Sequence, residues 1–267
     1  MRTVQYERLR PGEILAEKAR RSIVYLPIGP LEWHGPAMPF GTDPLAAWHA
    51  AILSAQETGG VVLPLLYAGT ERERSSKLLA DAGFEDTTQY IVGMDVPKNS
   101  MKSLYWPEEV FGVIVREYLR LLVAQEYRLI VLVNGHGATG QITTLERLAI
   151  EFTSTTSSKV IVAMGLAHYD ATDEDYGHAT RLETAIQMYL DPENVNLAML
   201  PPKSEKLRST DWGIIDGFTF DGNPPEDKCV VYDPRDATAE MGGKYVAAGA
   251  AYLANIVTKA YEDIAQD

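Results

Sequence analysis

The stretch "SIVYLPIGPLEWHGPAMPFGTD", residues 22–43, decides how this chain folds. Its first seven residues, 22–28, form a largely apolar run that predicts a buried strand. A run that is apolar on both faces is typical of a strand covered by helices on both sides. Two carboxylates and an imidazole follow among glycines and prolines between residues 31 and 43. We therefore predict a core strand that leads directly into a polar site.

Strand-like and helix-like segments alternate along the rest of the chain. Further apolar runs predict strands at residues 61–67, 128–134 and 159–165. Apolar residues at helical spacing, with start and stop signals, predict helices at residues 43–60, 107–127, 139–154 and 237–265. Because strands that alternate with helices form parallel sheets, the predicted fold class is α/β with a mostly parallel central sheet between helices.

No linker rich in proline or glycine divides the chain, so we predict one domain over residues 1–267. Two segments interrupt the alternation, at about residues 69–106 and 201–233, and both are rich in charge, Gly, Pro and aromatics. Long irregular inserts of this kind are often binding loops. Ligands of open α/β sheets bind beyond the carboxyl ends of the strands, so the polar residues after each strand are the first candidates for a site.

Composition narrows the class of protein. The net charge of −13 argues against a nucleic-acid binder or a binder of anionic membranes, because both need a basic surface. A single cysteine, Cys229, excludes an intrachain disulfide, and its acidic surroundings disfavour a nucleophilic role. No apolar run approaches transmembrane length and no signal-peptide pattern begins the sequence, so we expect a cytoplasmic protein.

The residues after the first predicted strand could bind a metal. Glu32 and His34 are two residues apart, so in extended backbone their side chains point to the same side. Asp43 ends the same segment and precedes Pro44 and a helical pattern. Asp43 therefore has two interpretations, a helix N-cap with proline at the first helical position or a third member of the polar site.

Other histidines follow the third and fourth predicted strands. His136 stands between glycines in "NGHGATG", where a ligand can approach the backbone closely; a packing role is the alternative. His178 lies in a glycine-flanked loop, and Glu183 lies in the first turns of the helix that follows, where the helix dipole also favours an acid. His49 lies within a predicted helix and is assigned to packing, while the role of His168 stays open.

Three carboxylates and two imidazoles suit one or two divalent ions such as Zn²⁺, Mn²⁺ or Fe²⁺. A bridging carboxylate between two ions would allow a hydroxide to be held between them. The predicted metal-binding residues are Glu32, His34, Asp43, His136 and Glu183.

Four ordered motifs resemble those of the creatininase family, the creatinine amidohydrolases and their relatives. They read "LPIGPLEWHGPAMPFGTD", "NGHGATG", "HATRLET" and "YDPRDATAEMG", and they span residues 26–242. The resemblance implies a three-layer α/β/α sandwich, a binuclear metal centre and a homohexamer. It also implies that Asp43 bridges the ions and that His178 assists proton transfer. Some members have a glutamate where this chain has Ala138, so Glu183 is the better candidate for the fifth ligand.

The resemblance implies a hydrolase that uses a metal-bridging hydroxide to cleave an amide or cyclic amide C–N bond of a small polar substrate. Two alternatives are a hydrolase that opens a cyclic ketone of an inositol-derived sugar by C–C cleavage, and a non-catalytic metal or small-molecule binding protein. Creatininase closes its site with tryptophans, whereas this chain has none between His136 and Glu183, and Thr180 replaces a common glycine. We therefore expect a substrate other than creatinine.

Side chains that select the substrate are expected from the irregular segments. Tyr176 and Trp106 are the predicted substrate contacts. Other charged and aromatic residues of the two inserts are also available: Arg72, Arg74, Lys98, Lys102, Tyr105 and Trp212.

Overall fold

A computed structural model describes residues 3–71, 75–81, 83–88, 91–95, 101–166, 177–207, 215–216 and 232–266. Its α-helices are α1 Pro11–Arg20, α2 Thr42–Thr58, α3 Ser76–Asp81, α4 Glu108–Ala124, α5 Thr139–Thr155, α6 Arg181–Leu190 and α8 Ala239–Gln266. Its strands are β1 Ile23–Gly29, β2 Val61–Val62, β3 Leu66–Tyr67, β4 Leu129–Asn134, β5 Lys159–Met164, β6 Gly177–His178 and β7 Ile215–Asp216. Short 3-10 turns are η1 Tyr6–Arg8, η3 Pro192–Asn194, η4 Leu197–Met199 and η6 Pro234–Asp236.

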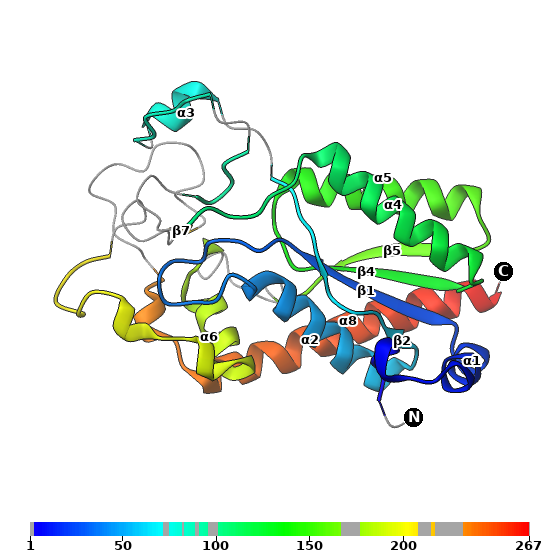
Figure 1. Cartoon of the computed structure of the whole chain (residues 1–267). Coiled ribbons are helices and arrows are strands. Elements are labelled where there is room, and N and C mark those ends of the chain that lie inside the picture. The colour runs from blue at the N-terminus through cyan, green and yellow to red at the C-terminus, as the bar shows by residue number, and fades with distance from the viewer. Residues whose placement is uncertain are drawn as a thin grey trace.

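The central sheet is parallel and has the order β2-β1-β4-β5, with β3 also paired to β1 (Figure 1). The register between β1 and β4 pairs Ile28 with Asn134, so the two strands end side by side. A separate antiparallel pair joins β6 to β7. The predicted parallel sheet is confirmed.

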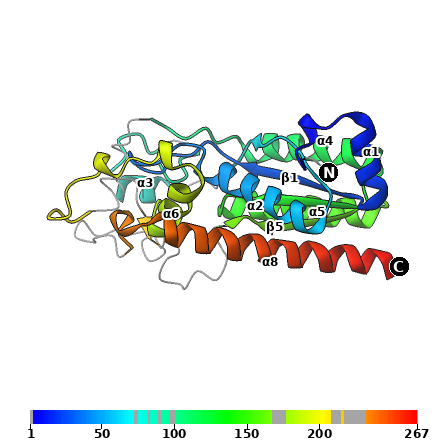
Figure 2. The ribbon, with the colours of Figure 1, turned by 90° about the horizontal axis from the view of Figure 1, so that it is seen from below.

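Helices cover both faces of this sheet. Figures 1 and 2 show α4 and α5 on one face and α2 and α8 on the other. Alternate residues of β1 enter different cores: Tyr25 packs with α2 and α8, whereas Leu26 packs with α4 and α5. The three-layer α/β/α arrangement predicted from the resemblance is therefore confirmed. No helix in the described ranges is long and apolar enough to cross a membrane.

The structure differs from the prediction in two elements. The expected strand at residues 61–67 is broken into β2 and β3, because Pro64 lies between them and has no N–H to continue the ladder. Helix α1 was not predicted from the sequence. It begins with Pro11 at its first position, and Glu13 accepts a hydrogen bond from the Arg10 N–H at 2.8 Å.

The connections reverse direction at the carboxyl ends of β1 and β4. From β1 the chain crosses one face through α2 to reach β2, and it later crosses the other face through α4 to reach β4 (Figure 1). The strand order therefore reverses between β1 and β4. In open α/β sheets this reversal is where ligands bind.

Candidate metal centre

Glu32 and His34 follow β1 and are both buried. The Glu32 N–H donates to the Phe40 carbonyl at 2.9 Å, which closes the intervening loop. The His34 Nδ1 lies 3.1 Å from the carbonyl oxygen of Glu32, so this nitrogen carries the hydrogen. The Nε2 atom of His34 then faces Asp43 Oδ1 at 3.1 Å. This is the usual arrangement of a metal-binding histidine, in which the second ring nitrogen donates to a carbonyl.

Asp43 is not a helix N-cap, so that interpretation is wrong. Helix α2 begins at Thr42 with Gly41 as its N-cap. The reason is a turn one residue earlier, in which the Thr42 hydroxyl and N–H both donate to the Pro39 carbonyl, at 2.7 and 3.2 Å. The Asp43 carboxylate is free to face inward, where Oδ1 meets His34 and Oδ2 lies 3.0 Å from His136 Nδ1.

His136 is held at the end of β4 by Asn134. The Asn134 side chain donates to the His136 carbonyl at 2.7 Å and accepts from the His136 N–H at 3.2 Å. Gly135, between them, touches the first turn of α2, since a Cβ there would lie 2.2 Å from the Asp43 carbonyl oxygen. The glycine thus allows His136 and Asp43 to approach. The alternative packing role for His136 gains no support, because its buried Nε2 has no hydrogen-bond partner among the described residues.

Glu183 occupies the first turn of α6, as the helix-dipole interpretation expects, and it also reaches the site. Its Oε2 accepts from the Ala179 N–H at 2.5 Å and lies 3.7 Å from His34 Nε2. The place of Glu183 in the first turn is therefore compatible with its place in the cluster. Thr180 needs no glycine at its position, because its φ is −80°.

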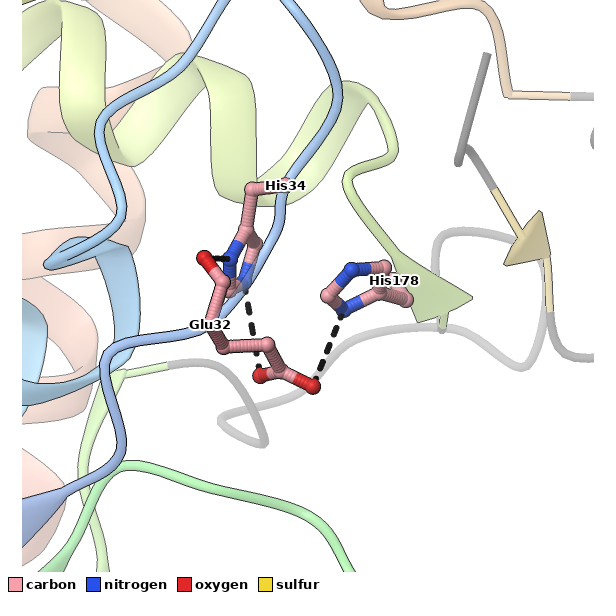
Figure 3. A group of neighbouring side chains, drawn as sticks. All are labelled: Glu32, His34 and His178. Atoms are coloured by element: carbon pink, nitrogen blue, oxygen red, sulfur yellow. Dashed lines mark hydrogen bonds and ion pairs between the residues drawn. The ribbon is translucent and has the colours of Figure 1, made fainter. Parts of the chain in front are cut away.

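His178 lies beside His34, with ring centroids 4.2 Å apart. Its Nε2 donates to the Trp33 carbonyl, which leaves Nδ1 as the nitrogen with the lone pair. Figure 3 shows that Nδ1 facing the Glu32 carboxylate, and the distance to Oε1 is 3.9 Å. His178 is therefore oriented toward the cluster from β6.

The potential ligand atoms fall into three groups, each within 4.8 Å. Two groups share Asp43, and the third links His178 to the residues after β1. The groups are Glu32, Asp43 and His136; His34, Asp43 and Glu183; and Glu32, His34 and His178. The five predicted metal-binding residues are thus brought together in space from β1, α2, β4 and α6.

The electrostatics of the cluster fit a cation. Among the described residues, the carboxylates of Glu32, Asp43 and Glu183 form ion pairs with histidines alone. Burial by itself would lower the pKa of His34, but the neighbouring Asp43 and Glu183 carboxylates outweigh it and raise that pKa to about 10. Protons on the imidazoles therefore balance the acids here, and divalent cations would balance them in the same place.

The pKa values of the Asp43 and Glu183 carboxyl groups are shifted in opposite directions. Burial opposes ionisation of Asp43, but the adjacent His34 and His136 imidazoles hold its pKa far below the usual range. Burial raises the pKa of Glu183 to about 8. Burial and the positive charge on His34 lower the pKa of His178 to about 3, so its imidazole is neutral. Paired acids whose pKa values are driven apart are typical of functional sites.

Two further side chains reach the cluster from the insert that follows β3. The Tyr105 hydroxyl donates to Glu32 Oε1, and the Tyr105 ring centroid lies 5.9 Å from that of His136. Glu71 is buried, with Oε2 at 3.9 Å from His136 Nε2. Sequence reasoning included Tyr105 among possible substrate contacts and missed Glu71. The available signal was position, because the carboxyl end of β3 opens on the same sheet edge.

Trp106 is half-buried and packs against the core beneath α4 and α5, and its predicted contact with a substrate stays a prediction. His49 lies on α2 with its ring against Trp48, consistent with packing. Lys102 is exposed. The remaining residues considered from sequence lie outside the described ranges: Arg72, Arg74, Lys98, His168, Tyr176, Trp212 and Cys229.

Comparisons with known proteins agree with this geometry. The family model described as "Creatininase: Creatinine amidohydrolase" matches residues 7–257. A crystal structure of creatinine amidohydrolase (creatininase) is 18% identical, with a TM-score of 0.68 over 98% of this chain and 99% of that one. A mutant creatininase of the Zn-Zn type is 17% identical, with a TM-score of 0.67 over 97% and 98% of the two chains. A manganese creatininase is 19% identical, with a TM-score of 0.67 over 97% and 99%. No curated protein sequence matches the chain.

Proposed function

The chain belongs to the creatininase family of metal-dependent amidohydrolases, and we propose that it hydrolyses an amide or cyclic amide C–N bond of a small polar molecule at a binuclear centre. The observation that carries this proposal is the position of Asp43. Its two carboxylate oxygens face different histidines, His34 and His136, at 3.1 and 3.0 Å. A single carboxylate placed between two donor groups suits a bridge between two ions.

The chain's own residues would hold the two ions as follows. Glu32, Asp43 and His136 would hold one, and His34, Asp43 and Glu183 would hold the other. Nitrogen and oxygen donors of this kind suit Zn²⁺, Mn²⁺ or Fe²⁺, and the related structures include zinc and manganese forms. Two such ions supply Lewis acidity, which polarises a carbonyl and lowers the pKa of water.

His178 would transfer the proton. Because its Nε2–H is engaged by the Trp33 carbonyl, its Nδ1 lone pair faces the cluster. Nδ1 can accept a proton during attack and return it to the departing nitrogen. The third ligand group, Glu32, His34 and His178, favours a competing role for His178 as a metal ligand.

The substrate is proposed to differ from creatinine, since the tryptophans expected to close a creatininase site are absent between residues 136 and 183. Opening of an inosose ring and metal binding without catalysis are the competing functions. A homohexamer and a cytoplasmic location remain predictions from the resemblance and from composition.

The first experiment is elemental analysis of gently purified protein, followed by a turnover assay. We expect two equivalents of a divalent metal per chain. The assay panel contains creatinine, formamides and inosose, and we expect hydrolysis of an amide in it. Less than a tenth of an equivalent of metal would contradict the proposal. Turnover of inosose without any amide would replace it with the C–C hydrolase.

The role of His178 is tested with His178→Ala against His49→Ala, a histidine outside the cluster. His178→Ala is expected to keep both ions and to lower kcat by roughly 10²–10⁴-fold. His49→Ala should change neither. Loss of an ion from His178→Ala would instead assign His178 as a ligand, and unchanged turnover would favour a role outside catalysis.

A further inference from the structure

The two oxygens of the Glu32 carboxylate have different surroundings. Oε1 accepts the hydrogen bond from the Tyr105 hydroxyl. Oε2 is buried and has no hydrogen-bond partner among the described residues. It lies 3.1 Å from His136 Nδ1, but that nitrogen is engaged with Asp43 Oδ2 at 3.0 Å. The phenol therefore holds one oxygen, while the other faces the His136 and His34 imidazoles inside the cluster.

The direction of the Tyr105 hydrogen bond is fixed by the backbone. The Met94 N–H donates to the Tyr105 hydroxyl at 3.2 Å. A phenol has one hydrogen, and because the Met94 contact uses the oxygen as acceptor, that hydrogen is available for Glu32. Tyr105 thus acts as a donor to a carboxylate, which makes the bond charge-assisted.

The Tyr105 ring is enclosed by the turn that supplies Met94. Gly93, in this turn, has φ +57°, and a Cβ there would lie 2.2 Å from Tyr105 Cε2 and 2.4 Å from its hydroxyl oxygen. A side chain at residue 93 would therefore displace the phenol. The ring is confined between this turn and the His136 imidazole.

The backbone around Tyr105 is joined to the segment that carries Glu32. The Leu104 N–H donates to the Leu31 carbonyl at 2.8 Å. The Ser103 hydroxyl accepts from the Trp33 N–H at 2.9 Å and lies 2.6 Å from Asp95 Oδ1, to which it donates. Hydrogen bonds on both sides of Glu32 thus set the distance between the phenol and the carboxylate.

We propose that Tyr105 is a positioning residue for the metal centre: its hydroxyl holds Glu32 Oε1, so that Glu32 binds through Oε2 alone to the ion shared with Asp43 and His136. This inference rests on the proposed binuclear site. Without the phenol, the Glu32 carboxylate is free to rotate and to offer either oxygen. No contact of Tyr105 with His34, Asp43 or Glu183 is found among the described residues, so an ion held by these three should be affected less.

The test is Tyr105→Phe, which keeps the ring and removes the hydroxyl. Its affinity for one of two Zn²⁺ ions should fall by roughly 10–100-fold, as for other partners of metal ligands. Affinity for the second ion should stay within about twofold of that of the wild type. Chelator-buffered zinc titration measures both, and the visible spectrum of the Co²⁺-loaded protein should change for one ion only.

Tyr127→Phe is the matched control, because the Tyr127 hydroxyl is buried with no hydrogen-bond partner among the described residues and Tyr127 precedes β4, at the opposite end of that strand from His136. Gly93→Ala is a second variant, which displaces the phenol without removing it. The affinity for the same ion should decrease. Wild-type zinc affinities and an unchanged Co²⁺ spectrum in Tyr105→Phe would overturn the assignment. An equal decrease in the affinity for both ions would also overturn it. Wild-type protein that binds no metal would overturn the proposed function itself.

Discussion

The carboxylates at the two ends of the sheet have different ion-pair partners. At the amino end, Glu17 accepts from the Gly60 N–H at 2.7 Å, and its charge is paired with Arg20 at 2.6 Å. Beyond the carboxyl end, Glu32, Asp43 and Glu183 gather without a pairing lysine or arginine in the described part of the chain. Among the described residues, a permanent positive charge pairs with a carboxylate at only one of these two ends.

The difference separates an acid whose charge is compensated within the fold from acids whose positions suit a bound cation. A buried carboxylate is tolerated when a partner cation and hydrogen bonds compensate its desolvation, as at Glu17. Three carboxylates whose only ion-pair partners among the described residues are histidines are compensated only if those histidines are protonated or if metal ions bind. The second solution is the one that the family membership supports.

The largest effect should come from Asp43→Asn, which removes the residue common to two of the ligand groups. Both ions should be lost, with an affinity decrease larger than the roughly 10–100-fold typical of an outer partner. Elemental analysis and zinc titration measure this. Asp263→Asn, at the exposed pair with Lys159, is the control. Retention of one ion at wild-type affinity would show that Asp43 serves a single ion.

Removal of the metals by a chelator should lower Tm substantially. An ion present at 1,000 times its Kd stabilises the folded state by about 4 kcal/mol. For a chain of this size, 1 kcal/mol corresponds to about 2–4 °C, so a decrease of at least about 8 °C is expected. Differential scanning calorimetry with and without added Zn²⁺ measures the shift. An equal Tm in both conditions would contradict a buried metal centre.

Glu17→Ala should affect the amino end of the sheet, away from the metal centre. It leaves the buried Gly60 N–H without its acceptor and removes the partner of Arg20, so the free energy of unfolding should decrease by about 2 kcal/mol. Metal content and turnover should not change. Urea unfolding measures the loss, with Glu240→Ala at an exposed helical pair as control. A simultaneous loss of metal would remove the distinction drawn between the two ends.

The smallest effect concerns Asp233, a partly exposed carboxylate that is also paired by the chain. It accepts hydrogen bonds from the backbone and guanidinium of Arg235, whose side chain also donates to the carbonyls of Pro201, Pro202 and Glu205. Burial opposes ionisation, but the bonds from Arg235 outweigh it and lower the pKa of Asp233. Its contribution to stability is therefore present above its unfolded pKa, about 3.9.

That contribution should be lost as the pH falls through the lowered folded pKa. Wild type should resist urea better than Asp233→Asn at pH 7, and the difference should become smaller as the pH falls below about 3.9. The protein should first be freed of metal with a chelator, so that metal binding does not contribute to the measured stability. A difference that is as large at pH 3 as at pH 7 would show that Asp233 acts through packing rather than charge.

Several elements could be predicted because their pattern is local. The apolar run before Gly29 and the runs that became β4 and β5 identify buried strands without knowledge of their neighbours. The prediction failed where one residue overrides the pattern, as at Pro64, or where a turn moves a helix start, as at Thr42. In both cases the competing hydrogen bonds, and not hydrophobicity, decide the boundary.

The sequence by itself determined the α/β class and the five residues that gather at the site, since each stands just beyond a strand or at a helix start. Only the tertiary structure decided how Asp43 divides them into two groups, which nitrogen of each histidine faces inward, and that Tyr105 and Glu71 join them. The reason is distance along the chain. Tyr105 is 73 residues from Glu32, and His136 is 93 residues from Asp43. Such contacts follow from the register of β1 with β4 and from the packing of the insert, which no local pattern encodes.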